Sequence, residues 1–353
     1  MERIKQKPEL PKNPLPIVVI GAGGIVTDAH LPAYEIAEFP VLGIYDLEVE
    51  KTQKAKGNYP FVQRIYNDFD ELSKDLDTND VVVDLAIPAG EIFGILERLP
   101  DGVTVLIQKP MGENLEEAQR ILNICREKKL KSGVNFQLRY APYCIAARQL
   151  INEGWLGDIY DYEIKVCVYT PWHLWDFLFD LPRVEILYHS IHYIDLIRSF
   201  AGNPVKIYAS SVKHPKMKEL SSTRSTIVMD FDDCVQARIL TNHGHDFGGK
   251  HQESYFKIEG TKGAIKITIG VSLDYPKGIP PRFEYIINRD GKGWRKLTLT
   301  GGWFPHAFVG PMAGIQRFHS GEDKVLLHDT EDAFETMKWV EKAYKSSESG
   351  GVK

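Results

Sequence analysis

The first 140 residues alternate short apolar runs with longer polar or amphipathic segments, and this alternation restricts the fold more than any other feature. Strands alternating with helices favour a parallel sheet covered on both faces. The sequence therefore predicts a Rossmann-type doubly wound α/β domain over residues 15–140, preceded by a flexible arm over residues 1–14. The strands are expected at 16–20, 41–45, 81–87, 103–107 and 133–136, and the helices at 29–38, 48–56 and 115–128.

The rest of the chain, residues 141–353, is dominated by strand-like runs separated by few residues, which favours hairpins and an antiparallel sheet. We expect a second α/β domain with a large, open, mainly antiparallel sheet. Because the strands outnumber the helices available to cover them, one sheet face is expected to be buried in a homodimer or homotetramer. The runs lie at 159–169, 205–212, 225–231, 235–241, 254–260, 264–269 and 283–287, with helices at 185–201, 307–319 and 331–346.

Composition excludes several classes of protein. The chain has 353 residues with 43 basic and 48 acidic side chains, so it has no positive surplus for binding nucleic acid. No apolar run reaches the roughly 18 residues of a membrane span. The cysteines, Cys125, Cys144, Cys167 and Cys234, show neither CxxC pairing nor zinc-ligand spacing. We therefore expect a cytoplasmic protein with free thiols and no metal, acting on a small molecule.

The first apolar run ends in a glycine-rich turn, Gly21-Ala22-Gly23-Gly24-Ile25-Val26. This turn nearly fits the dinucleotide fingerprint GxGxxG, with Val26 in place of the last glycine. The first glycine permits the tight turn, and the second lets the backbone approach a pyrophosphate at the start of the next helix. The turn therefore predicts a cofactor site that includes Gly21, Gly23, Gly24, Ile25 and Val26; a purely structural turn is the alternative.

Asp46 ends the second predicted strand, 25 positions after Gly21. A carboxylate there accepts hydrogen bonds from the ribose hydroxyls of NAD and repels the 2′-phosphate of NADP. The alternative is that Asp46 caps the following helix. No arginine lies in the next four residues, so the sequence favours NAD over NADP.

Six motifs in this order resemble the glucose–fructose oxidoreductase/inositol dehydrogenase family, Gfo/Idh/MocA. They are GAGGIVTDAHLPAY at 21–34, AIPAG at 86–90, VLIQKPMGENLEEA at 105–118, NFQLRYAP at 135–142, HYIDLIRSFAG at 192–202 and IEGTKGAIKI at 258–267. The resemblance covers nearly the whole chain. It implies a Rossmann domain followed by an α/β domain with an open antiparallel sheet. It also implies that Ile87, Pro88, Gln108, Lys109 and Asn135 belong to the cofactor site.

Lys109 matches the lysine of the family's Glu-Lys-Pro motif, whereas Gln108 replaces the glutamate. A lysine at a strand end near the nicotinamide can bond a substrate hydroxyl and assist proton transfer, and burial would lower its pKa. Without the resemblance, Lys109 is more simply interpreted as an exposed side chain. Gln108 removes a negative charge beside Lys109, which should ease loss of the ammonium proton.

A second catalytic segment lies in the predicted helix at 185–201. The family presents an aspartate and, four residues later, a histidine on one helix face; here these positions are Tyr188 and His192. Histidine titrates near neutrality and suits removal of a hydroxyl proton, so His192 is the expected base. Tyr188 could orient a hydroxyl. His189 is either a partial substitute or a packing residue.

Aromatic side chains gather just before this helix, at Trp172, His173 and Trp175. The resemblance places the edge of the substrate site in this region, and aromatic faces bind the apolar faces of sugar rings. Ordinary packing is the alternative. His306, which precedes a later helix, is a further candidate for substrate contact.

Together these features predict an NAD-dependent oxidoreductase that transfers hydride between nicotinamide and a CH–OH group of a sugar, sugar derivative or cyclitol. The resemblance leaves two alternatives. One is an NAD-dependent glycoside hydrolase that works through transient oxidation; the other is a non-catalytic, cofactor-binding sensor.

Overall fold

The computed structural model describes residues 4–78, 80–275, 277–288 and 291–351. The chain forms two compact units. The parallel-sheet unit comprises Lys7–Tyr140 and Phe304–Met337, and the open-sheet unit comprises Met1–Gln6, Ala141–Trp303 and Lys338–Lys353. The sequence predicted a single domain boundary near residue 140. It did not predict that the chain returns to the first unit at Phe304.

The segment expected to be a flexible arm is hydrogen-bonded where it is described, and its residues 1–3 lie outside the described residues. The backbone N–H of Lys5 donates to Gln149 within the open-sheet unit. The backbone N–H of Lys12 donates to Glu322 within the parallel-sheet unit. Both acceptors are distant in sequence, so the sequence pattern of the arm could not indicate them.

The parallel-sheet unit contains a six-stranded sheet with strand order β3-β2-β1-β4-β5-β6, all of it parallel. The order reverses direction at β1 and β4, as in doubly wound dinucleotide-binding folds. The strands are β1 Ile17–Ile20, β2 Val41–Tyr45, β3 Val62–Ile65, β4 Val82–Leu85, β5 Thr104–Ile107 and β6 Lys131–Val134. Every residue of β1, β4 and β5 is buried, as expected for strands covered on both faces.

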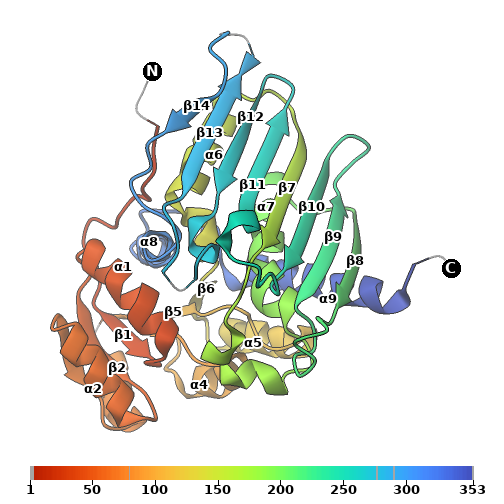
Figure 1. Ribbon diagram of the computed structural model, residues 1–353. Coiled ribbons are helices and arrows are strands. Elements are labelled where there is room, and N and C mark those ends of the chain that lie inside the picture. The colour runs from red at the N-terminus through yellow and green to blue at the C-terminus, as the bar shows by residue number, and fades with distance from the viewer. Residues whose placement is uncertain (1–3, 79, 276, 289–290, 352–353) are drawn as a thin grey trace. The chain divides into compact units, whose positions relative to one another are not determined.

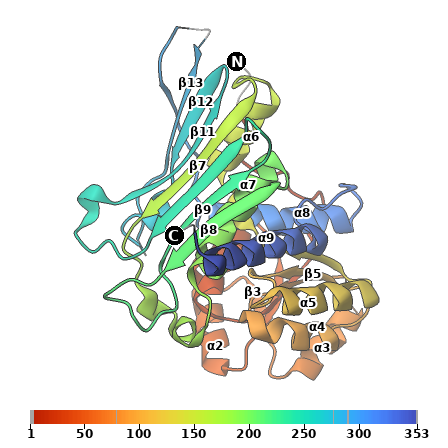
Figure 2. The same ribbon diagram turned by 90° about the vertical axis from the view of Figure 1, so that its right-hand side faces the viewer.

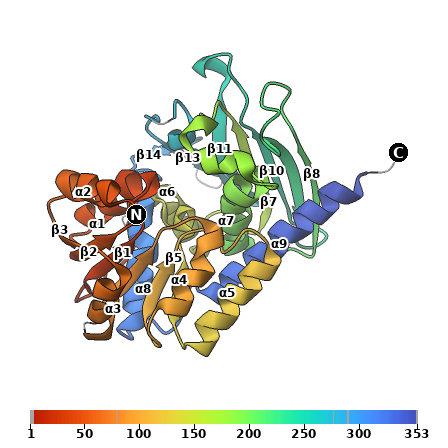
Figure 3. The ribbon, with the colours of Figure 1, turned by 90° about the horizontal axis from the view of Figure 1, so that it is seen from below.

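Helices connect these strands, and α4 and α5 lie side by side (Figure 3). The helical elements are the π-helix η1 Val26–His30, α1 Leu31–Ile36, α2 Val49–Asn58, α3 Phe69–Thr78, η2 Ala89–Glu91, α4 Ile92–Arg98, α5 Leu115–Glu127, η3 Gln137–Tyr140, η10 His306–Phe308 and α8 Val309–His319. Helix α8, from the returning segment, packs against β5 and β6.

The sequence pattern missed β3, α3 and α4. Strand β3 lies at the sheet edge, and only Val62 of its four residues is buried, so it has little apolar signal. The expected strand at 133–136 lies two residues earlier, at Lys131–Val134. The expected helix at 29–38 begins at Val26 with a π-helical turn and ends at Ile36.

The open-sheet unit contains an eight-stranded sheet with strand order β14-β13-β12-β11-β7-β10-β9-β8 (Figure 1). Neighbouring strands are antiparallel except β7 and β10, which pair in parallel. This confirms the prediction of a mainly antiparallel second sheet. The strands are β7 Ile159–Cys167, β8 Lys206–Val212, β9 Arg224–Asp230, β10 Gln236–Asn242, β11 Glu253–Gly260, β12 Gly263–Thr268, β13 Arg282–Ile287 and β14 Arg295–Leu297.

Helices α6, α7 and the last part of α9 lie along one face of this sheet (Figure 2). The other face carries partly exposed ion pairs, such as Arg238 with Asp161, together with exposed Tyr208 and Leu240. The sequence pattern missed α6 and β14. The helical elements are α6 Pro142–Asn152, η4 Trp172–Leu174, η5 Asp176–Asp180, the π-helix η6 Glu185–Ser190, α7 Ile191–Ala201, η7 Gly249–His251, η8 Gly270–Ser272 and α9 Thr330–Ser349, which continues from the parallel-sheet unit.

The turn after β1 depends on the missing side chain of Gly21. Its φ of +105° is one that residues with a Cβ rarely adopt. A Cβ built there would lie 2.2 Å from the carbonyl oxygen of Ala86, directly after β4. At Gly23, in contrast, a Cβ would meet no described atom within 4 Å. Gly21 is therefore required for the close approach of β1 and β4, whereas Gly23 leaves space open.

We predict that Gly21→Ala strongly destabilises the protein and that Gly23→Ala does not. The first adds backbone strain and a steric clash, with an expected loss of about 2–4 kcal/mol in the free energy of unfolding. Gly23→Ala is the matched control and should change stability by less than about 0.5 kcal/mol. Thermal and urea unfolding of the two variants measures this. Equal stability of both would contradict the assignment of Gly21.

Candidate active site

The glycine turn is closed by the side chain of Asp46 at the end of β2. Its Oδ2 accepts a hydrogen bond from the Ala22 N–H at 2.7 Å, and its Oδ1 accepts one from the Glu48 N–H at 2.9 Å. Asp46 therefore orders both the turn after β1 and the approach to α2. The capping alternative accounts for only one of these bonds, and the half-exposed carboxylate keeps lone pairs for a ligand.

The residues of the turn fit a bound dinucleotide. The π-helix η1 beyond it begins at Val26, and the N–H groups of Val26 and Thr27 both donate to the carbonyl oxygen of Gly23 in the turn. Gly23 leaves open space beside them. Val26 is fully buried at the start of the π-helix η1 and packs where the fingerprint has its third glycine. Ile25 is half-buried and Gly24 exposed at the same turn.

The remaining cofactor candidates stand at the carboxyl ends of β4, β5 and β6. Ile87 and Pro88 follow β4, Gln108 and Lys109 follow β5, and Asn135 follows β6. Asn135 Nδ2 donates to Gln108 Oε1 at 3.1 Å. Asn135 Oδ1 is buried without a hydrogen-bond partner among the described residues. Such an unpaired acceptor is costly in a folded protein and marks a place where a ligand can contribute the missing donor.

Lys109 is a basic side chain at the carboxyl end of β5. Burial lowers the pKa of Lys109 to about 7, because removal from water disfavours the ammonium form. A lysine with this pKa exchanges its proton near neutral pH and can serve as an acid or a base. The structure thus places Lys109 at the carboxyl end of β5, next to the edge strand, and gives it suitable acid–base properties.

Tyr188, His189 and His192 lie in the open-sheet unit. The first two belong to the π-helix η6, and His192 belongs to α7, which follows directly. The Ile191 N–H bonds to the carbonyl of Ile186, five residues earlier, which widens the turn. The prediction that Tyr188 and His192 project from one face of a helix assumed a regular α-helix. His192 is buried with its ring 5.0 Å from that of Trp303, whereas His189 is half-buried against Trp172 and His243.

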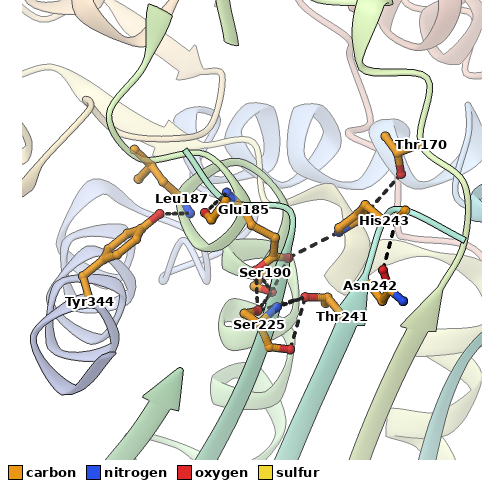
Figure 4. Close-up of polar contacts among 11 residues, drawn as sticks. Thr170, Glu185, Leu187, Ser190, Ser225, Thr241, Asn242, His243 and Tyr344 are labelled. Atoms are coloured by element: carbon orange, nitrogen blue, oxygen red, sulfur yellow. Dashed lines mark hydrogen bonds and ion pairs between the residues drawn. The ribbon is translucent and has the colours of Figure 1, made fainter. Parts of the chain in front are cut away.

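A buried polar cluster lies at the start of η6 (Figure 4). Glu185 is fully buried, and its carboxylate accepts hydrogen bonds from the hydroxyls of Ser190 and Ser225. His243 Nε2 lies 3.3 Å from Glu185 Oε1, and its Nδ1 lies 2.8 Å from Thr170 Oγ1. The ring of His189 lies 4.4 Å from that of His243, between centroids. The cluster therefore connects the Glu185 carboxylate, through His243, to His189, which is a candidate for substrate contact.

Burial alone would raise the pKa of Glu185, but hydrogen bonds and charge from His243, with the two serine hydroxyls, reverse this and lower it. Glu185 is therefore ionised at neutral pH. The sequence analysis did not identify Glu185, His243 or Thr170 as functional residues. The one signal was a glutamate inside an otherwise apolar helical face; its partners lie on β9 and after β10 and have no sequence signature.

The aromatic candidates separate into packing and surface groups. Trp172 is 3% exposed and packs with Leu178, Val184 and Leu220, so its ring is part of a core cluster. Trp175 borders that cluster and Tyr275, while His173 is exposed. His306 belongs to the parallel-sheet unit, where burial lowers its pKa.

We predict that Glu185→Gln lowers stability by about 3 kcal/mol near neutral pH, since a buried charge with three donors is lost. Because the folded pKa of Glu185 is lowered, its stabilisation is present above about pH 4.5 and disappears as the pH falls through the folded value. The difference between the wild type and the variant, measured by urea unfolding, should therefore shrink in acid. Glu253→Gln, which removes a half-exposed ion-pair partner, is the control and should cost less than about 1 kcal/mol. A pH-independent difference for Glu185→Gln would contradict an ionised Glu185.

Within the described part of the chain, no helix is long and apolar enough to cross a membrane. No group of three or more His, Cys, Asp or Glu side chains in those residues is arranged to hold a metal ion.

Comparison with known proteins identifies similar chains. The chain is 24% identical over 291 residues to the uncharacterized protein YMR315W of Saccharomyces cerevisiae, covering 74% of this chain and 76% of that protein. It is 26% identical over 173 residues to 1,5-anhydro-D-fructose reductase of Ensifer adhaerens, covering 48% of this chain and 51% of the reductase. The fold is similar to that of an oxidoreductase from Agrobacterium radiobacter crystallised with NAD+, L-tartaric acid and magnesium. That match has a TM-score of 0.76 and 18% identity, covering 96% of this chain and 98% of that one.

Family comparison covers both parts of the chain. Residues 15–136 match the oxidoreductase family with an NAD-binding Rossmann fold, GFO_IDH_MocA. Residues 144–266 match the GFO/IDH/MocA C-terminal domain. These two ranges span more than half of the 353 residues and confirm the resemblance inferred from the motifs. The chain is therefore a member of the GFO/IDH/MocA oxidoreductase family, and its parallel-sheet unit carries that family's NAD-binding Rossmann fold.

Proposed function

We propose that the protein catalyses NAD-linked hydride transfer at a CH–OH group of a sugar, sugar derivative or cyclitol. The observation that carries the proposal is Lys109, a lysine with a pKa of about 7 at the carboxyl edge of an NAD-binding sheet. A residue with this property at such a place is typical of proton transfer at an active site. Similarity to a 1,5-anhydro-D-fructose reductase supports a sugar-like substrate.

NAD, when bound, supplies the hydride acceptor for the oxidation. The protein positions the alcohol and takes its proton. In this proposal the neutral amine of Lys109 and the imidazole of His192 share that task, and the Tyr188 hydroxyl orients the substrate hydroxyl. His189, Trp172, His173, Trp175 and His306 remain proposed substrate contacts; the burial of Trp172 favours a packing role for that ring.

A non-catalytic sensor is the second candidate, and it is favoured by the neutral Gln108 and Tyr188 at positions where the family has carboxylates. A glycoside hydrolase that uses NAD transiently is the third. Absorbance of reduced nicotinamide during incubation with a panel of sugars and cyclitols separates these functions. Net reduction of NAD supports the dehydrogenase, and release of an aglycone without net reduction supports the hydrolase. Cofactor binding without either reaction supports the sensor.

We also propose a homodimer or homotetramer formed through the uncovered face of the eight-stranded sheet. Exposed Tyr208, Val212 and Leu240 lie there among charged side chains, a mixture common at interfaces between subunits. Light scattering that gives the mass of a single chain would exclude this. A cytoplasmic location is proposed because Cys125, Cys144, Cys167 and Cys234 are free thiols.

We expect NAD to bind at least about tenfold more tightly than NADP, because the carboxylate of Asp46 repels a 2′-phosphate. Calorimetric titration with the two cofactors measures the ratio. Asp46→Asn should reduce it by removing the charge, and Glu48→Gln, which changes an exposed carboxylate nearby, should leave it unchanged. A preference for NADP in the wild type would contradict the role of Asp46.

We expect Lys109→Ala and His192→Ala each to lower kcat/KM by about 10²–10⁴-fold, with little change in NAD affinity. In the oxidation direction, kcat/KM should rise with pH through about 7, since only the neutral amine of Lys109 accepts a proton. Lys109→Arg keeps the positive charge and should remove this step from the pH profile. If His189→Ala were far more damaging than His192→Ala in a folded protein, His192 would not be the base.

A further inference from the structure

The buried Glu185 cluster of the open-sheet unit has no part in the reaction as proposed above. A buried carboxylate and a buried imidazole are nevertheless costly unless they are paired. Three groups of this cluster form a hydrogen-bonded line, which runs from the Glu185 carboxylate through the His243 ring to the Thr170 hydroxyl (Figure 4). Glu185 is 0% exposed, His243 1% and Thr170 7%, so accessibility increases along the line toward Thr170.

The charge of Glu185 fixes the direction of each hydrogen bond in this line. An ionised carboxylate only accepts, so the hydroxyls of Ser190 and Ser225 and the Nε2 of His243 all donate to it. The neutral His243 ring, with its proton on Nε2, keeps a lone pair on Nδ1. Thr170 Oγ1 lies 2.8 Å from that nitrogen and therefore donates its proton to it. The order carboxylate, imidazole, hydroxyl is the one that activates a hydroxyl oxygen in enzymes.

A second imidazole and two neutral phenols lie around the Glu185–His243 pair. The ring of His189 on η6 packs against that of His243, so a proton on one ring disfavours a proton on the other. Burial, and after it the charge of Glu185, raise the pKa of Tyr193 on α7 and of Tyr344 on α9, so both phenols are neutral near neutral pH. Glu185 is therefore the negative charge that a proton gained by His243 meets at hydrogen-bond distance.

We propose that Thr170, His243 and Glu185 form a proton relay that accepts the proton of a substrate hydroxyl during oxidation. The substrate hydroxyl gives its proton to Thr170 Oγ1, while Thr170 gives its own proton to His243 Nδ1. The hydride from the same substrate carbon goes to NAD, the oxidant of the proposed function, so a carbonyl forms and one proton remains on the relay. The resulting imidazolium donates from Nε2 to Glu185, which balances its charge. In the reduction the proton returns along the same path.

Glu185 supplies an ionised carboxylate that position 188 lacks. The family resemblance expects an aspartate at that position, where this chain has Tyr188. Glu185 lies three residues earlier in the same π-helix η6, and π-helical turns are frequent at functional sites. Because its charge is fully buried, Glu185 acts on a substrate through His243 and Thr170 and is a positioning residue.

The relay shares the proton transfer proposed for Lys109 and His192, and it gives the proton a favourable place to rest. Burial disfavours the ammonium form of Lys109. An imidazolium at His243, in contrast, has its Nε2 3.3 Å from Glu185 Oε1. The inference rests on the proposed function, because the relay needs a substrate hydroxyl that is oxidised.

The tautomer of His243 in the unmutated protein is the first test, and it needs neither substrate nor cofactor. At about pH 8, where an imidazole is ordinarily neutral, ¹⁵N chemical shifts of the ring should show a protonated Nε2 and an unprotonated Nδ1. A proton on Nδ1 would make Thr170 the acceptor of this hydrogen bond, and its hydroxyl could not pass a proton to the ring. That result would overturn the relay.

Thr170→Val and Thr223→Val separate the relay hydroxyl from a neighbouring one. The backbone carbonyl of Thr223 accepts from the His243 N–H, but its buried hydroxyl has no hydrogen-bond partner among the described residues. Thr170→Val should move the ¹⁵N shift of His243 Nδ1 to that of a lone pair without a donor, and Thr170→Ser should restore it. Thr223→Val should leave the shift unchanged. An unchanged shift in folded Thr170→Val would overturn the assignment of Thr170.

Turnover tests the catalytic role, with the member of the sugar and cyclitol panel that the wild type oxidises fastest. Thr170→Val should lower kcat/KM by at least about tenfold with unchanged NAD affinity, and Thr170→Ser should recover most of the loss. Thr223→Val should change kcat/KM by less than about twofold. A loss below about twofold in folded Thr170→Val would overturn the relay. If the wild type oxidises no member of the panel, the proposed function fails, and the ¹⁵N measurements alone decide for or against the relay.

Discussion

Parallel pairing of six strands brings their carboxyl ends to one edge, and the NAD site depends on that constraint. Gly21, Asp46, Gln108, Lys109 and Asn135 are far apart in sequence, yet each follows or ends a strand of the same sheet. The edge is closed at its centre because Gly21 has no side chain to meet the carbonyl of Ala86. A bulkier residue there would separate β1 from β4, whose turns form the centre of the site.

Both units bury a carboxylate that pairs with a histidine and with hydroxyl groups, although Asp84 Oδ1 has no hydrogen-bond partner among the described residues. Asp84 is paired with His30 and Tyr34, and Glu185 with His243, Ser190 and Ser225. Such groups contribute little net stability compared with apolar packing. Removing one partner is nevertheless costly, because it leaves an uncompensated charge in the low dielectric of the core. One network reaches Gln108 through Asn135, and in the other His243 contacts the ring of His189.

Lys109 differs from these groups because burial lowers its pKa and so favours its neutral form. Desolvation is the cause that lowers its pKa to about 7, and the neutral Gln108 beside it adds no compensating charge. A glutamate at that position would favour the ammonium form by Coulomb attraction. The exchange of Glu for Gln therefore moves the acid–base balance of Lys109 toward the neutral amine, which is the form that the proposed reaction requires.

Much of the fold and of the cofactor site follows from sequence pattern alone. The buried runs of β1, β2, β4 and β5, the glycine turn and the acidic end of β2 are local signals, since burial on both faces produces continuous apolar runs and a tight turn demands glycine. The mainly antiparallel second sheet was predictable from the short connections between its strands. Edge strand β3 was missed because only Val62 of its residues is buried. Helices α3, α4 and α6 were also missed, although α3 buries Phe69, Leu72 and Leu76 at helical spacing.

Tertiary structure alone decided the rest. The return of Phe304–Met337 to the parallel-sheet unit and the hydrogen bonds of the amino-terminal segment depend on partners distant in sequence. So do the pairs Glu185–His243 and His30–Asp84, which are 58 and 54 positions apart. Residue types, turns and periodicities are local properties of the chain, so they can be inferred from the sequence. The direction of a hydrogen bond, and the burial that shifts a pKa, exist only once distant strands have brought their ends together.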